Sequence, residues 1–256
     1  MKTIKKIIIM LIALTLTACG GYNNARKTEI NDRKQSANIN VQLASGYMKR
    51  GQFEVAKEKL LKAIDLDDSY VPAYTTMAVL MNGLGKVEEA KSYYLDALDI
   101  DSNNPELLNN YGTFLCQHNE LDEAKEQFIK ALNNPLYETP EVAHSNMGYC
   151  LMKNDNPDYE LIEKHLRLAL TANPNMRSSL LAMGELGIKT KRYLMARAYM
   201  QRYHAISNPT SASLWLQIQA EKALGDQKHF AQLSKQLLDD FADSPEAKNL
   251  KELTRR

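Results

Sequence analysis

The feature that most constrains this 256-residue chain is a periodic series of small side chains. The series has steps of 34, 34, 36 and 36 residues and consists of Ala44, Ala78, Gly112, Gly148 and Gly184. A second series of small residues follows, twelve positions later where both are present, and consists of Ala56, Ala90, Ala124, Ala196 and Ala231. Repetition at this period indicates units that each bury their apolar face against a neighbouring unit. The chain therefore needs no single globular core.

Small side chains at these positions let two helices approach closely, while larger apolar side chains fill the space between them. The period and the order of the residues match the tetratricopeptide pattern of paired helices. The predicted fold is all-α: a right-handed superhelical solenoid of about six tetratricopeptide repeats with a C-terminal capping helix. The repeats are expected near 37–70, 71–104, 105–138, 141–176, 177–210 and 212–245, and the cap over 245–256. A fold of this kind is built for binding.

The first repeat has more apolar residues on its first helix than one buried stripe requires. These residues are Ile39, Val41, Leu43, Tyr47 and Met48. Nothing before Ala37 has the pattern of a cap, so one interpretation is an open end that receives an apolar helix of a partner protein. The other is a terminus partly capped by the residues that precede it. The sequence leaves both open.

The N-terminus has the three parts of a bacterial lipoprotein signal. Basic residues (Lys2, Lys5 and Lys6) precede an apolar run over 7–16, and Leu16-Thr17-Ala18-Cys19 follows. The run has about half of the ~20 residues that a membrane-spanning helix needs, which favours a cleaved leader over 1–18. The mature chain would begin at Cys19, with acyl chains on that residue. The alternative is an ordinary leader with a chance cysteine.

Residue 20 is Gly rather than the Asp associated with retention in the inner membrane. The expected location is therefore the inner leaflet of the outer membrane, where acylated Cys19 holds the chain facing the periplasm. Residues 19–36 are expected to be the lipidated cysteine and a flexible tether, because they are polar and lack sustained periodicity. As a random coil, such a segment reaches roughly 20–25 Å.

Motifs for catalysis, metal binding and nucleic-acid binding are not found in the sequence. The formal net charge is +1, which gives no basic excess for nucleic acid. No two of the five histidines lie three or four residues apart, as a helical zinc site requires; they are His118, His144, His165, His204 and His229. Phosphate-binding loops and nucleophile elbows are also missing. We expect no enzymatic activity, no cofactor, no metal and no small-molecule substrate.

Cys116 and Cys150 fall on the first helices of the third and fourth repeats, which are neighbours. In an oxidising periplasm, two thiols on adjacent helices are a plausible disulfide pair. The alternative is a pair of small buried apolar side chains. The spacing does not decide between them.

Taken together, the lipobox and the repeats resemble the PilF/PilW family of type IV pilus lipoproteins. The resemblance covers the whole chain, and its most specific segments are Leu16–Cys19, Tyr111–Cys116 and Ala143–Cys150. It implies an outer-membrane pilotin that binds subunits of the pilus secretin and assists their localisation, multimerisation or stability. It also implies that the apolar groove of the first repeat makes the contact. The alternative is a tetratricopeptide lipoprotein that serves as a scaffold for outer-membrane barrel assembly or for cell-wall enzymes.

Overall fold

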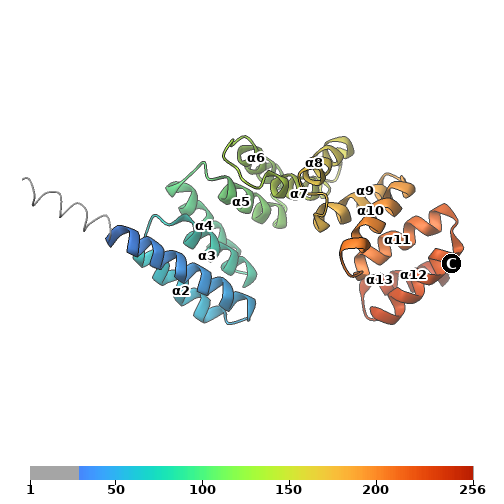
Figure 1. The fold of residues 1–256 in the computed structure, drawn as a ribbon, viewed down its shortest axis with the longest axis horizontal. Coiled ribbons are helices and arrows are strands. Elements are labelled where there is room, and N and C mark those ends of the chain that lie inside the picture. Colours follow the sequence, from blue (N-terminus) through green and yellow to red (C-terminus); the bar gives the residue numbers. More distant parts are fainter. Residues whose placement is uncertain (1–28, 256) are drawn as a thin grey trace, which may run out of the picture. The chain divides into compact units, whose positions relative to one another are not determined.

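A computed structural model describes residues 29–255, which form α-helices joined by turns and short loops. The predicted all-α class is confirmed over this range (Figure 1). None of the helices between residues 29 and 255 is both long and apolar enough to pass through a bilayer. The leader over 1–18, Cys19 and the first part of the expected tether lie outside the described residues.

The chain divides into two compact units between Ser102 and Asn103. The first unit holds two helix pairs, which correspond to the first two predicted repeats. Its described helices are a segment over 29–49, α2 (Phe53–Leu66), α3 (Val71–Gly83) and α4 (Val87–Ile100). Helix α3 packs against both α2 and α4. The second repeat therefore rests on the second helix of the first repeat.

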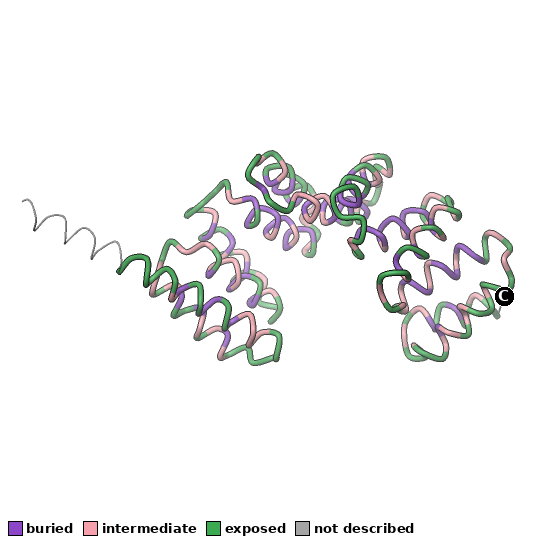
Figure 2. Tube along the Cα trace, viewed as in Figure 1, coloured by how far each residue is buried: buried purple, intermediate pink, exposed green. Residues whose placement is uncertain are grey.

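The second unit holds four further helix pairs and a final single helix. The pairs are α5 (Pro105–Gln117) with α6 (Leu121–Leu132), α7 (Pro140–Leu151) with α8 (Tyr159–Ala172), α9 (Arg177–Lys189) with α10 (Tyr193–Ile206), and α11 (Ser211–Leu224) with α12 (Gln227–Asp240). The last helix, α13 (Pro245–Arg255), packs on α11 and α12. First helices of neighbouring repeats also touch, as α5 with α7 and α7 with α9. Because they are contacted from several sides, first helices carry more buried residues than second helices (Figure 2).

The close approach of paired helices depends on the small residues that define the repeat. A Cβ atom added to Gly112 on α5 would lie 2.9 Å from Cε1 of Phe128 and 3.1 Å from the carbonyl oxygen of Ala124 on α6. No real side chain fits at these distances without a shift of the neighbouring helix. The spacing of small residues along the chain therefore follows directly from the distance between two helices of one repeat.

The small-residue series differs from the structure at one position, Ala231, which is exposed. Ala56 and Ala196 are the fourth residues of α2 and α10, and both are fully buried. Helix α12 begins at Gln227, so its fourth residue is Phe230, one position before Ala231. Phe230 packs on a C-terminal cluster around Leu237 and Leu250. The sixth repeat thus has a large residue at the position where most of the other repeats have a small one, and this residue packs on the C-terminal cluster.

The prediction of a flexible tether over 19–36 is wrong for residues 29–36, which belong to the first helix, and residues 19–28 lie outside the described residues. The Arg33 guanidinium holds this segment against the end of α2. Its Nε donates to the carbonyl oxygen of Leu66 at 2.9 Å, and one Nη donates to that of Asp65 at 3.2 Å. These carbonyls lack intrahelical partners at a helix C-terminus, and a cation is stabilising there. A polar composition was therefore compatible with helix.

Five turns between paired helices contain a residue with a left-handed backbone, and Lys191 is the one least suited to it. Its φ is 57°, whereas Gly85 occupies the equivalent turn with φ 75°. A residue with a side chain pays about 1–2 kcal/mol to adopt this conformation, and glycine does not. Glycine, however, loses more conformational entropy on folding, which cancels part of this advantage. We expect Lys191→Gly to raise the free energy of unfolding by about 0.5–1 kcal/mol in urea denaturation. Gly85→Ala should lower it, since its Cβ meets no atom within 4 Å and only backbone strain is added.

Candidate functional site

One row of positions on the first helix of each repeat distinguishes the first repeat from all the others. In the first repeat the row is Ile39, Leu43 and Tyr47, which lie four residues apart and so share one helix face. The row recurs 34 residues later as Ala73, Met77 and Met81 on α3, where all three are fully buried. Helix α3 packs against both the preceding helix α2 and its own partner α4, so its row is covered from within the first unit.

The same row is buried in every later repeat. Its members there are Leu107, Tyr111 and Leu115; Ala143, Met147 and Leu151; Ser179, Met183 and Gly187; and Ser213, Gln217 and Glu221. In the first repeat, by contrast, Ile39 is 49% exposed, Leu43 is 44% exposed and Tyr47 is half-buried. Within residues 29–255 no helix pair precedes this row. We call Ile39, Leu43 and Tyr47 the N-terminal row.

The two remaining residues of the candidate set lie elsewhere on the first helix. Val41 is buried, and at about 100° per residue it is turned by about 200° from Ile39 around the helix axis. It therefore packs inside the first repeat and offers no surface to a partner. Met48 is half-buried beside Tyr47. The structure thus narrows the predicted binding residues to the N-terminal row with Met48 at its edge.

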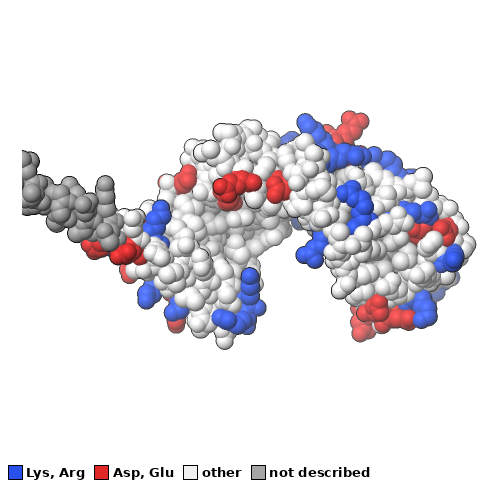
Figure 3. All heavy atoms as spheres, viewed as in Figure 1, with Lys and Arg blue, Asp and Glu red and all other residues white. Residues whose placement is uncertain are grey.

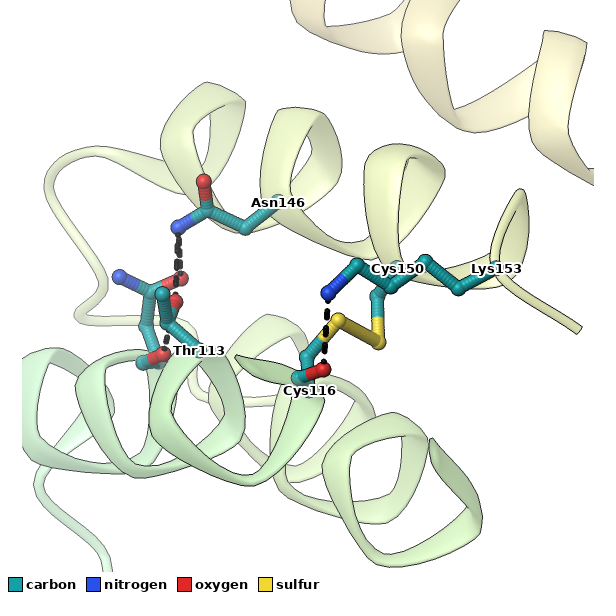
Figure 4. The surroundings of a disulfide bond; sticks show 6 residues. Thr113, Cys116, Asn146, Cys150 and Lys153 are labelled. Atoms are coloured by element: carbon teal, nitrogen blue, oxygen red, sulfur yellow. Dashed lines mark hydrogen bonds between the residues drawn. A yellow bond between two sulfur atoms is a disulfide. The ribbon is translucent and has the colours of Figure 1, made fainter. Parts of the chain in front are cut away.

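Helices α5 and α7 are joined by a disulfide between Cys116 and Cys150 (Figure 4). The two Cα atoms lie 5.7 Å apart, and both side chains are buried. Lys153 lies beside the disulfide, and its Nζ donates a hydrogen bond to the carbonyl oxygen of Cys116 at 3.1 Å. The bond therefore links the third and fourth repeats at the C-terminal ends of their first helices.

Side-chain amides fasten the same two helices one turn away from the disulfide. The Nδ2 atom of Asn146 on α7 donates to Oδ1 of Asn109 at 3.0 Å and to Oγ1 of Thr113 at 3.2 Å, both on α5. A buried amide that keeps its hydrogen bonds fixes the register of two helices more tightly than apolar contact alone. The joint between the third and fourth repeats is thus held by covalent and polar contacts.

Two histidines that are far apart in the sequence meet within the fourth repeat. Nδ1 of His144 on α7 lies 2.9 Å from Nδ1 of His165 on α8, so one ring donates a hydrogen bond and the other accepts it. Burial, together with the charges of His144, Lys164 and Lys125, lowers the pKa of His165 to about 4. Burial, with the charge of Lys164, also lowers the pKa of His144. Over residues 29–255 no group of three or more His, Cys, Asp or Glu side chains is placed to hold a metal.

The histidine pair makes stability dependent on pH between about 4 and 6.5. In this window the unfolded chain binds a proton at residue 165 that the folded chain does not bind, so stability is complete above pH 6.5 and falls as the pH falls. We expect about 2–3 kcal/mol less stability at pH 4.5 than at pH 7 from His165. Urea denaturation at both values should show that His165→Gln removes this share of the loss. The exposed residue Gln232 provides the control, because Gln232→Ala removes no titrating group and should leave the pH dependence unchanged.

A buried charge network connects the fifth and sixth repeats. Glu221, the last residue of the row in the sixth repeat, is 1% exposed and accepts hydrogen bonds from Nε and Nη2 of Arg197 on α10. The same guanidinium lies 3.5 Å from a carboxylate oxygen of Asp226. Nearby, Nε2 of His204 pairs with Oγ of Ser213 at 2.9 Å. The interface between α10 and α11 is therefore polar, unlike the apolar one between α2 and α3.

The histidine pair and the Arg197–Glu221 network are among the contacts that the sequence did not predict. Residues 21 or 24 positions apart have no helical spacing that would flag them. A partial signal was present for Glu221, because the row in the sixth repeat reads Ser213, Gln217 and Glu221, which predicts a polar interface.

Known tetratricopeptide repeats match this chain directly. The family descriptions that match are both tetratricopeptide repeats, one over residues 71–104 and the other over residues 93–126. The first of these ranges coincides with the predicted second repeat.

Full-length relatives extend this similarity to nearly the whole chain. The type IV pilus assembly protein PilF of Pseudomonas aeruginosa is 32% identical over 239 residues, which is 92% of this chain and 93% of the relative. A solved structure of Pseudomonas aeruginosa PilF has a TM-score of 0.77 at 28% identity and covers 86% of this chain and 99% of its own. The crystal structure of PilW, a type IV pilus biogenesis factor, also has a TM-score of 0.77 at 28% identity, with 84% and 98% covered. Because similarity at this level spans both chains almost completely, this protein belongs to the PilF/PilW family of tetratricopeptide-repeat proteins.

Proposed function

We propose that this protein is an outer-membrane lipoprotein that binds the pilus secretin and assists its localisation, multimerisation or stability. Membership of the family implies a role in type IV pilus biogenesis. The tetratricopeptide fold supports a role in binding other proteins and not in catalysis. The observation that carries the proposal is the exposed N-terminal row.

The N-terminal row indicates what kind of segment the partner contributes. Every later repeat buries the equivalent row, and α3 does so against a helix. An apolar helical segment of a secretin subunit that lay on Ile39 and Leu43 would reproduce this packing. Because Ile39 and Leu43 are each about half exposed, complete burial by a partner contributes about 1.5–3 kcal/mol in total before the cost of association is subtracted. Such a contact suits capture of a subunit that has not yet assembled.

The lipobox supplies the second part of the proposal. Several acyl chains on Cys19 would hold the protein at the membrane, because each buried methylene contributes about 0.8 kcal/mol. Anchoring raises the local concentration of the solenoid near the bilayer without any extra contact with its partner. The residues between Cys19 and the first helix would then set how far the N-terminal row reaches from the membrane.

The experiment that tests this function is a pull-down of membrane-extracted protein with mass spectrometry of the retained partners. We expect the wild type to retain the pilus secretin. Ile39→Ser combined with Leu43→Ser should reduce the recovered secretin by at least about tenfold, since two buried aliphatic contacts are lost. Cys19→Ser should leave the solenoid folded but reduce secretin multimers in the outer membrane at native expression.

Matched variants separate the row from general surface hydrophobicity. Leu95 and Ile129 are similarly exposed aliphatic residues on α4 and α6, and changing both to Ser should leave secretin recovery unchanged. Equal loss with this control pair would show that the N-terminal row is not the contact. Recovery of barrel-assembly subunits or cell-wall enzymes without secretin would replace the pilotin function by the scaffold alternative.

A further inference from the structure

The fourth and fifth repeats carry a concentration of positive charge that the proposed function does not use. Between Glu163 and Glu221 the sequence contains eight Lys or Arg residues and a single acidic residue, Glu185. Figure 3 shows Lys and Arg side chains gathered over the region of α8 to α10, with acidic side chains at one margin. We define the basic face by its five exposed cations, which are Lys164, Arg167, Lys191, Arg192 and Arg202.

Lys164, Arg167 and Arg202 lie on exposed stripes of two helices, whereas Lys191 and Arg192 lie in the turn just before α10. On α8 the stripe runs through Lys164, Arg167, Leu168 and Thr171, which are spaced as one face of a helix. On α10 it runs through Leu194, Ala198, Arg202 and Ala205. Exposed Glu160 lies one turn before Lys164 on α8, and from Lys164 onward the charged residues on the two stripes are all basic.

Contacts between the stripes hold the surface in place. Glu163, whose side chain is only 17% exposed, lies 2.6 Å from both Arg167 on its own helix and Arg192 at the start of α10. Arg202 donates to the carbonyl oxygen of Pro174 just beyond α8 at 2.9 Å. Glu163 is the partly buried carboxylate between Arg167 and Arg192. The five cations and this one carboxylate leave a net positive charge of four on the basic face. The outward edges of these cations remain open to a ligand.

Exposed aliphatic and aromatic side chains lie among the cations. Leu194 is 67% exposed and Leu168 is 41% exposed, and the Tyr199 ring lies 5.3 Å from the guanidinium carbon of Arg202. Isolated leucines and a tyrosine between lysines and arginines are typical of surfaces that lie at the boundary between lipid headgroups and acyl chains. The cations meet the phosphates, while the leucines enter the apolar layer.

We propose that the basic face docks on an anionic phospholipid surface and so lays the second unit of the chain against a bilayer. The proposal builds on the membrane attachment proposed above, because a chain already held at a bilayer needs only weak additional contacts. Each basic residue near an anionic membrane is worth about a factor of five in binding. The five cations and two leucines together are sufficient for reversible docking.

The test places a fluorescent label on the basic face of the full-length protein and measures its contact with added vesicles. Ala198→Cys lies within the α10 stripe, and Ala231→Cys on α12 is a matched exposed alanine outside it. Each variant is labelled with an environment-sensitive dye and mixed with vesicles of 70% phosphatidylethanolamine and 30% phosphatidylglycerol, or of phosphatidylcholine alone. Quenching by nitroxide-bearing lipid reports whether the label reaches the bilayer.

We expect quenching of the label at residue 198 on the anionic vesicles only, and none at residue 231. Lys164→Glu combined with Lys191→Glu should weaken the apparent affinity by at least about tenfold, as should high salt. The matched reversal of Lys228 and Lys248, on α12 and α13, should have no such effect. Equal quenching at both positions, or quenching that survives the reversal at Lys164 and Lys191, would overturn the proposal. A label at residue 198 that is never quenched would also overturn it and would favour an acidic protein as the ligand.

The outcome is independent of the proposed pilotin function. Mass spectrometry of the purified chain reads the acylation of Cys19, and the pull-down reads secretin binding, whereas the label reads only the basic face. Acylation without selective quenching would refute the docking surface alone. Selective quenching without secretin recovery would refute the pilotin function alone.

Discussion

Replacing both Cys116 and Cys150 with serine is expected to lower the free energy of unfolding by about 3–4 kcal/mol. The disulfide closes a loop of 34 residues, and a loop of this size restricts the unfolded chain by about that amount. In urea denaturation of the full chain without reductant, the double serine variant should have a lower midpoint than the wild type. Asn146 would still tie α7 to α5 through its amide, so we expect the fold to persist.

Reduction of the wild type provides the matched control for this variant. Dithiothreitol should bring the wild type to the stability of the double serine variant and should leave that variant unchanged. Mass spectrometry of unreduced peptides from exported protein should show the two cysteines in one linked species. Free thiols in exported protein, together with no effect of the reductant, would contradict the expectation that the bridge rigidifies the middle of the solenoid.

Arg197→Met is expected to destabilise the protein by about 3 kcal/mol. The change leaves the carboxylate of Glu221 buried without its guanidinium partner, and removal of one member of a buried ion pair costs several kcal/mol. Because α11 packs on α10 through this network, unfolding should begin in the sixth repeat and α13. Hydrogen exchange by mass spectrometry would show earlier opening of residues 211–255 than of residues 105–132.

A double-mutant cycle separates the pair from the packing of the arginine stem. Arg197→Met combined with Glu221→Met should recover most of the lost stability, since two apolar side chains of similar volume replace the ion pair. Arg202→Met is a control on the same helix and should cost less than about 1 kcal/mol, because Arg202 is exposed. A double variant that is no more stable than Arg197→Met would show that the stem, and not the buried charge, carries the effect.

The all-helical, repeated architecture was predictable because one physical constraint leaves a periodic mark on the sequence. Two helices of a repeat can approach only where a side chain is missing or very small, as at Gly112 against Phe128. This requirement recurs once per repeat, so it appears as a period. The pairs of helices found between residues 29 and 255 follow that period, including the longer fourth repeat.

Positions that depend on the exact helix start were less predictable. Ala231 continues the small-residue series by type, but α12 begins one residue too early for it to occupy the packed position, which is filled by Phe230. Residues 29–36 read as a polar tether, yet Arg33 finds free carbonyl groups at the end of α2. In each case a tertiary contact decides the structure, and composition alone carries no information about it.

The candidate site also combines features that the sequence predicts with features that depend on tertiary contacts. Apolar excess on the first helix predicts a binding surface there, and the burial of the equivalent rows in later repeats separates the exposed Ile39 and Leu43 from the buried Val41. The basic face was not predicted, because its cations come from α8, α10 and the turn just before α10, which are recognised as one surface only once the repeats are stacked. His144 and His165 likewise meet only through the pairing of α7 with α8.

The polar interface before the sixth repeat gives the array a fixed order. Most repeats here present an apolar row to the helix before them, and such units are in principle interchangeable. The sixth presents Ser213, Gln217 and Glu221, which are compatible only with a predecessor that supplies Arg197 and His204. Deleting and duplicating the fifth repeat therefore have unequal consequences. A deletion would bury the Glu221 carboxylate against a helix that lacks Arg197, whereas a duplication would keep Arg197 beside Glu221. Gain and loss of repeats in this chain are thus asymmetric, and its length is easier to increase than to reduce.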